Sequence, residues 1–94
     1  SADIKLPSME KSLIIGNYID NVKCESFLDS ETNRIRVRPL PNQGLPTKMV
    51  LECLKSIREA YPPGTQFKTE NVKVCKKPDG RIYLRAKDQM IYKI

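Results

Sequence analysis

The segment "NRIRVRPLPNQGLPTK", residues 33–48, decides the predicted fold more than any other part of the chain. Its first half places an arginine at every second position, and its second half breaks into prolines and a glycine. Alternation with a period of two is typical of a half-buried β-strand, whereas clustered Pro, Gly and Asn are typical of a loop. The segment therefore predicts a strand with one basic face, followed by an irregular connection.

A second alternating segment, "VKCESFL", precedes it at residues 22–28, with Val22 and Cys24 on the same face. The polar cluster "DSETN" between the two segments favours a turn, so together they predict a β-hairpin. Residues 12–19, "SLIIGNYI", predict an earlier short strand that is interrupted at Gly16.

Apolar side chains in residues 47–61 recur at the three- and four-residue spacing of one helical face. The sequence "PPG" at residues 62–64 ends that pattern. We therefore expect a helix over 47–61 that packs on the sheet through Val50, Cys53, Leu54 and Ile57.

The C-terminal third predicts β-structure. The turn signal "KKPDGR" joins alternating segments at residues 67–75 and 81–87, and "MIYKI" at 90–94 predicts one more short strand. A change of phase near residues 69–71 predicts a β-bulge. The element order is then β-β-α-β-β-β. This is an α+β fold in which one helix packs on one face of an antiparallel sheet and leaves the other face open.

Length and composition predict one small globular domain. Ninety-four residues, 39% hydrophobic and 30% charged, suffice for one modest core. We assign this domain to residues 9–94 and expect residues 1–8 to be a flexible arm or a remnant of protein expression. The longest apolar run inside "KSLIIGNYI", residues 13–15, is too short for a membrane span or a signal-peptide core. No membrane partner is expected, and the predicted location is cytoplasmic.

The basic charge of the chain is unevenly distributed. Seventeen Lys and Arg against eleven Asp and Glu give a net charge of +6. Residues 1–30 hold three basic and five acidic side chains, whereas residues 63–94 hold eight and three. Clustered cations raise the electrostatic potential of one surface, so this gradient favours an anionic partner.

Three cysteines, Cys24, Cys53 and Cys75, occur without C-x-x-C spacing and without any histidine in the chain. A tetrahedral zinc site would need a carboxylate from a scattered position to complete it. We therefore expect buried, reduced thiols, and neither a metal site nor a cofactor.

The strand segments "RIRVR" at 34–38 and "RIYLR" at 81–85 share one pattern, in which basic or aromatic residues alternate with aliphatic ones. Successive side chains on a strand point to opposite faces, so the aliphatic residues should face the core. If both strands belong to one sheet, the exposed residues form a basic platform with one aromatic ring. Guanidinium groups pair with phosphates, and an exposed tyrosine can stack on a base. The expected nucleic-acid-binding residues are Arg34, Arg36, Arg38, Arg81, Tyr83, Arg85 and Lys87.

Two alternatives stay open, one for these seven residues and one for the loop that follows the first basic strand. The cations can simply form the solvated face of a half-buried sheet, where long basic side chains also protect an edge strand from pairing with other chains. The loop "PLPNQGLP" could hold an anion with its backbone amides and the following helix N-terminus, although it lacks a phosphate-binding glycine motif and is better interpreted as a stiff connection.

Catalysis is not expected from this sequence. Without histidine, mechanisms that use imidazole as a general base are excluded. Within "PDGRIYLRAK", Arg85 occupies the place where the Asp…Glu-x-Lys pattern of metal-dependent nucleases needs a carboxylate. The chain is thus predicted not to be an enzyme.

The sequence favours a small non-catalytic module that binds nucleic acid, DNA or RNA and including single strands, through an arginine-rich sheet face. The alternative is a protein-interaction or self-assembly module. In that case an exposed edge strand, "MIYKI" or "RIRVRPL", pairs with another chain or forms a homodimer with its own copy.

Overall fold

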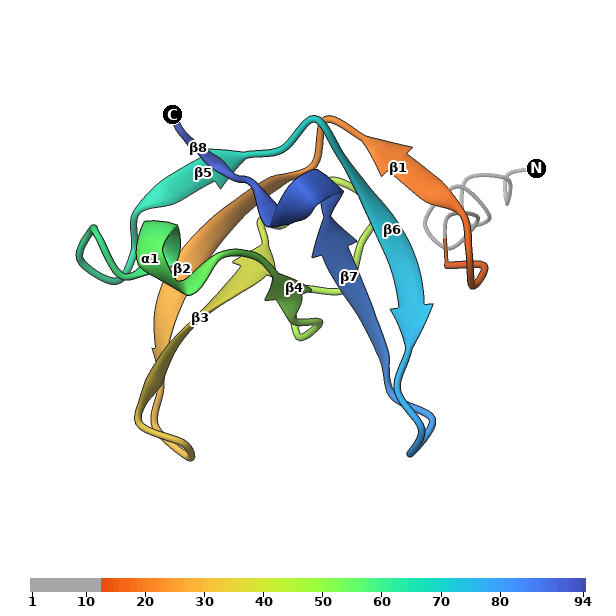
Figure 1. Ribbon diagram of the computed structural model, residues 1–94, viewed down its shortest axis with the longest axis horizontal. Helices are drawn as coiled ribbons and strands as arrows, with labels where there is room; N and C mark the ends of the chain where they lie inside the picture. Colours follow the sequence, from red (N-terminus) through yellow and green to blue (C-terminus); the bar gives the residue numbers. More distant parts are fainter. Residues whose placement is uncertain (1–12) are drawn as a thin grey trace.

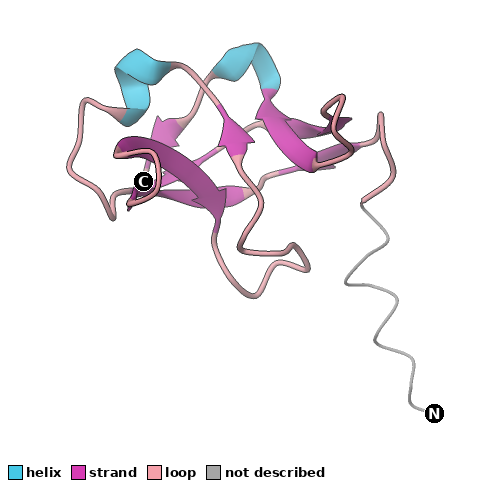
Figure 2. Ribbon diagram, turned by 90° about the horizontal axis from the view of Figure 1, so that it is seen from below, coloured by secondary structure: helices cyan, strands magenta, loops and turns pink. Residues whose placement is uncertain are grey.

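A computed structural model describes residues 13–94, and this part of the chain is mostly β (Figure 1). The expected arm at residues 1–8 lies outside the described residues. The strands are β1 (Tyr18–Asp20), β2 (Lys23–Asp29), β3 (Arg34–Pro39), β4 (Leu51–Glu52), β5 (Gln66–Lys68), β6 (Asn71–Lys76), β7 (Ile82–Ala86) and β8 (Tyr92–Lys93). One short α-helix, α1 (Lys55–Arg58), and a 3-10 turn at Lys87–Gln89 lie on the same side of the strands (Figure 2).

The strands form two four-stranded sheets. Sheet A has the order β1-β6-β7-β4, and sheet B has the order β3-β2-β5-β8. Neighbouring strands are antiparallel except for β4 and β7, which are parallel. The predicted hairpins β2–β3 and β6–β7 are confirmed, each within one sheet.

The two sheets are joined at a corner where two paired chain segments bend together. The segment β1–β2 turns at Asn21, and the segment β5–β6 turns between Thr69 and Glu70 (Figure 1). Across this corner Asn21 N–H donates to the Glu70 carbonyl at 3.0 Å, and Thr69 N–H donates to the Val22 carbonyl at 3.0 Å. The phase change near residues 69–71 is therefore the passage from sheet B to sheet A rather than a bulge within one strand.

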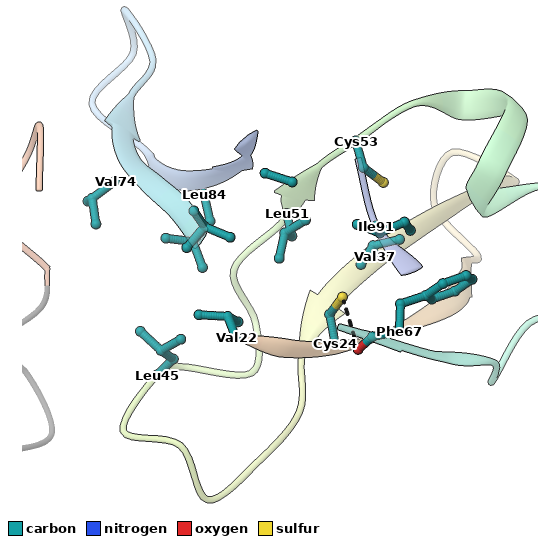
Figure 3. Close-up of a cluster of buried hydrophobic side chains, with 12 residues drawn as sticks. Val22, Cys24, Val37, Leu45, Leu51, Cys53, Phe67, Val74, Leu84 and Ile91 are labelled. Carbon is teal, nitrogen blue, oxygen red and sulfur yellow. Dashed lines mark hydrogen bonds between the residues drawn. The ribbon is translucent and has the colours of Figure 1, made fainter. Parts of the chain in front are cut away.

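The core lies between the inner faces of the two sheets (Figure 3). Alternating positions supply it, as expected for half-buried strands. For example, Val72, Val74 and Leu84 are fully buried, while their sequence neighbours Lys73 and Arg85 are exposed. The other buried hydrophobic residues are Val22, Cys24, Val37, Leu45, Leu51, Cys53, Phe67, Ala86 and Ile91.

The predicted helix over 47–61 is wrong in extent. Only Lys55–Arg58 is α-helical, none of those four residues is buried, and Leu54 is 39% exposed. Upstream of it, Leu51 faces Leu84 in the parallel β4–β7 pair, and Leu84 N–H donates to the Val50 carbonyl at 2.9 Å. Pairing with a distant strand satisfies the backbone and buries Leu51, so it overrides the helical period of the sequence.

The predicted packing of one helix on one face of a single antiparallel sheet is not confirmed. The expected strands are divided between two sheets, because the chain bends sharply at the corner. Of the side chains expected to anchor the helix, Cys53 is buried, while Val50 and Ile57 are only partly buried. No helix within residues 13–94 has the length and apolar character needed to cross a membrane.

The loop that follows β3 serves as a connection, since no helix begins at its end. Gln43 holds it to β2, because its side-chain amide donates to the Lys23 carbonyl at 2.7 Å and accepts from Lys23 N–H at 2.8 Å. Leu45 inserts into the core.

The three cysteines are free, as predicted. Cys24 and Cys53 are buried, whereas Cys75 is only partly buried on the outer face of sheet A. Burial raises the pKa of Cys24 to about 12 and also raises that of Cys53.

Two leucines provide a matched test of the core. Leu84→Ala removes a fully buried side chain and should lower the free energy of unfolding by roughly 2–5 kcal/mol. Leu54→Ala removes a side chain that is 39% exposed and should cost about 1 kcal/mol or less. Urea denaturation measures both, and equal losses would contradict the corrected helix assignment.

The thiols should react in two classes. In the native protein Cys75 should be labelled first by a thiol reagent, because Cys24 and Cys53 are buried and a buried thiol with a raised pKa forms little thiolate. Mass spectrometry of partly labelled protein identifies the modified residue. Labelling of Cys24 ahead of Cys75 would be inconsistent with this core.

Candidate nucleic-acid interface

A cleft lies between the β2–β3 hairpin and the β6–β7 hairpin, which form the two lower arms in Figure 1, with β4 between them. It consists of two adjoining hollows of about 340 and 460 Å³. Both hollows are lined by Arg36, Val50 and Lys77, so they form one continuous depression.

The lining of the cleft is basic. Six cationic side chains border it, against three carboxylates. The cations are Arg34, Arg36, Lys48, Arg58, Lys77 and Arg81, and the carboxylates are Asp29, Glu31 and Glu52. Apolar and aromatic surface lies among them, from Phe27, Met49, Val50, Ile82 and Tyr83. The cleft can therefore hold an anion beside a flat apolar group.

The strands β3 and β7 belong to different sheets, so the premise of one shared platform is not met. Four of the seven residues predicted from the sequence nevertheless line this cleft: Arg34, Arg36, Arg81 and Tyr83. They stand on opposite walls, two from the first hairpin and two from the second.

Arg36 lies against Asp29 across the first hairpin. Its Nε is 3.0 Å from Asp29 Oδ2, but the N–H is not directed at that oxygen, and this buried nitrogen makes no hydrogen bond among the described residues. The pKa of Asp29 is lowered mainly because its carboxylate accepts a hydrogen bond from Glu31 N–H, with Arg36 contributing less. The Arg36 side chain is 30% exposed and lines both hollows, so it is accessible from the cleft although its Nε is buried.

Arg81 and Lys77 lie in the turn of the second hairpin. Arg81 is tied to Asp79, with its Nε 3.0 Å from Oδ2, yet its side chain is 78% exposed. Lys77 Nζ lies 5.0 Å from the centre of the Tyr83 ring and 3.5 Å from Glu52 Oε2. Partial burial is the main reason why the pKa of Tyr83 is raised.

Three predicted residues lie outside the cleft. Arg85 adjoins it through Glu52, since its guanidinium is 3.6 Å from that carboxylate. Arg38 is held on sheet B, 2.9 Å from Glu25 and over the Phe27 ring. Lys87, in the 3-10 turn, is 3.6 Å from Glu70. Neither Arg38 nor Lys87 borders the cleft.

Three cations of the cleft, Lys48, Lys77 and Arg58, were not among the residues predicted from the sequence. Lys48 and Lys77 lie next to turns, where alternation carries no information about direction. Arg58 is structural in part, because its guanidinium donates to the carbonyls of Ile35 at 2.9 Å and Cys53 at 2.7 Å and so fastens α1 to β3.

Comparison with protein families, curated proteins and solved structures gives no match for this chain. Within residues 13–94, no three carboxylate or thiol side chains are grouped so that they could share a metal ion. Function has to be inferred from the chemistry of the site.

The balance of forces on Asp29 can be measured. Arg36→Ala should raise the pKa of Asp29 only part of the way toward its ordinary value of 3.8, because the Glu31 N–H that contributes most remains in place. Carbon-13 NMR titration of the Asp29 carboxyl group reports this value. A complete return to 3.8 would mean that the ion pair dominates.

Proposed function

We propose that this chain is a non-catalytic module that binds nucleic acid in the cleft between the two hairpins, with phosphate contacts as the main source of affinity. The observation that carries the proposal is the convergence of six cations from four separate chain segments on one depression. Such a depression attracts a polyanion more strongly than the same charges spread over the surface.

The individual side chains suit phosphate. Arg34 is exposed and has no carboxylate partner among the described residues, and Arg36, whose side chain is 30% exposed, lines both hollows. Arginine offers planar donors that match phosphate oxygens. The Tyr83 ring and the apolar surface of Met49 and Val50 lie beside these cations, where a base could pack.

The alternative that the basic residues are only the solvated face of a sheet explains fewer of the observed positions. It accounts for Arg38 and Lys87, which are paired with carboxylates on the surface. It gives no reason why cations from β3, the loop before β4 and the second hairpin should line one hollow. The cytoplasmic location remains a prediction from sequence.

A charge-matched pair of variants tests the proposal. The double substitution Arg34→Ala and Lys48→Ala should weaken binding to nucleic acid similarly for all sequences. It should also flatten the slope of log affinity against log salt by about 0.7 per lost contact on single strands, or about 0.9 on duplex. Fluorescence anisotropy at several salt concentrations measures both quantities.

The control removes the same number of charges elsewhere. Lys55 and Lys68 are exposed and do not line the cleft, so Lys55→Ala with Lys68→Ala should leave the slope nearly unchanged. Equal effects of the two double variants would locate binding outside the cleft, and no salt-sensitive binding by the unmutated protein at low ionic strength would refute the proposed function.

Self-assembly through β8 is a second candidate function, because β8 is an edge of sheet B, and Tyr92 within it and the adjacent Ile94 are 40% and 56% exposed. The backbone N–H of Ile94 donates to the Gln66 carbonyl of the neighbouring strand β5 at 3.1 Å. Because successive N–H groups of a strand point to opposite sides, the N–H of Lys93 points away from β5, toward the open edge of the sheet.

A homodimer that forms through β8 should dissociate in Lys93→Pro, since proline removes only the outward donor. Sedimentation velocity over a range of concentrations tests this. A monomeric unmutated protein at every concentration would end this candidate.

A further inference from the structure

The outer face of sheet A carries a second group of residues that adjoins the cleft. Strand register places Tyr18, Lys73, Arg85 and Glu52 in one row across all four strands. In the next row Tyr83 faces Cys75. Glu52 and Tyr83 also line the cleft, so this face and the cleft are continuous.

Both tyrosines of this face are accompanied by a lysine. Lys73 Nζ lies 5.9 Å from the centre of the Tyr18 ring, and Lys77 Nζ lies 5.0 Å from the centre of the Tyr83 ring. Tyr18 is 66% exposed although it belongs to a regular strand. A ring paired with a cation in this way can receive a base on its surface and a phosphate beside it.

From this arrangement we propose that the ligand is single-stranded nucleic acid, which runs from the cleft across the outer face of sheet A and stacks bases on Tyr83 and Tyr18. This proposal rests on the proposed function and specifies its ligand. Lys73, Lys77 and Arg85 contact the phosphates between and beside the two bases.

The spacing of the rings favours an unstacked strand. Tyr18 and Tyr83 are two strands and two residues apart, which corresponds to roughly 12 Å at ordinary strand spacing and rise. Stacked nucleotides follow one another at about 3.4 Å, so neighbouring bases of a regular stack cannot cover both rings. A single strand can splay its bases apart, whereas a duplex hides their faces.

Charge agrees with this path. The outer face bears Lys73, Lys77 and Arg85 against Asp20 and Glu52, and Glu52 already lies between Lys77 and Arg85. The cleft and the outer face of sheet A, taken together, therefore carry more cations than carboxylates.

The test compares binding of single-stranded DNA and RNA with binding of the corresponding duplexes. Each probe is about 12 nucleotides long, which lies within the range of site sizes that small single-strand-binding domains cover. The unmutated protein should bind one or both single strands more tightly than the duplex. Tyr18→Ala should lower single-strand affinity by about 5- to 150-fold with an unchanged salt slope, because stacking depends little on salt. Tyr18→Phe keeps the ring and should retain most of the affinity.

Tyr92→Ala is the matched control, since Tyr92 is an exposed tyrosine on sheet B. Lys73→Ala should flatten the salt slope, in contrast to Tyr18→Ala. Equal losses in Tyr18→Ala and Tyr92→Ala, or duplex binding as tight as single-strand binding, would overturn this inference and leave cleft binding standing. No binding by the unmutated protein to any of these probes would overturn both proposals. Circular dichroism confirms that each variant is folded.

Discussion

The carbonyl oxygen of Val22 is the acceptor on which the rest of the structure depends. It receives the backbone N–H of Thr69 at 3.0 Å and the hydroxyl of the same residue at 2.9 Å, and Thr69 is 3% exposed. Without these bonds a buried carbonyl and a buried hydroxyl would both lose their partners at the corner, which is costly. With them, two paired segments turn together and one ladder passes from sheet B into sheet A. The turn thereby joins the two sheets that carry the hairpins.

The corner also explains how a small chain can hold a cleft. A single flat sheet would have placed the arginines of β3 and β7 side by side on one surface. Two sheets joined at an angle instead direct their hairpins to opposite sides of a shared depression, with β4 between them (Figure 1). Residues that are distant in sequence thereby meet, and a few cations suffice to give the depression a positive potential.

Local patterns predicted local structure well. The alternation around Val37 and Leu84 indicated the buried faces of their strands, and the turn chemistry at Gly80, where φ is 96°, indicated the second hairpin. The segment after Pro46 could not be predicted, because Leu51 pairs with β7 across 33 positions and periodicity contains no information about that partner. The candidate site followed the same division. Arg34, Arg36, Arg81 and Tyr83 were found from alternation, whereas Lys48 and Lys77 came to the cleft through loop geometry. Tyr18 came to the outer face of sheet A through pairing with a strand far along the chain.

The parallel pairing of β4 with β7 has a consequence for the order of folding. The two hairpins close short loops, whereas β4 and β1 must find partners far away in sequence. Loop closure over such distances is entropically costly, so these contacts form late and slow the overall reaction. Because Val50 and Glu52 on either side of Leu51 border the cleft, the depression is complete only when β4 has docked on β7. A chain that has formed both hairpins but not yet added β4 therefore carries most of its basic residues without a preorganised place for an anion.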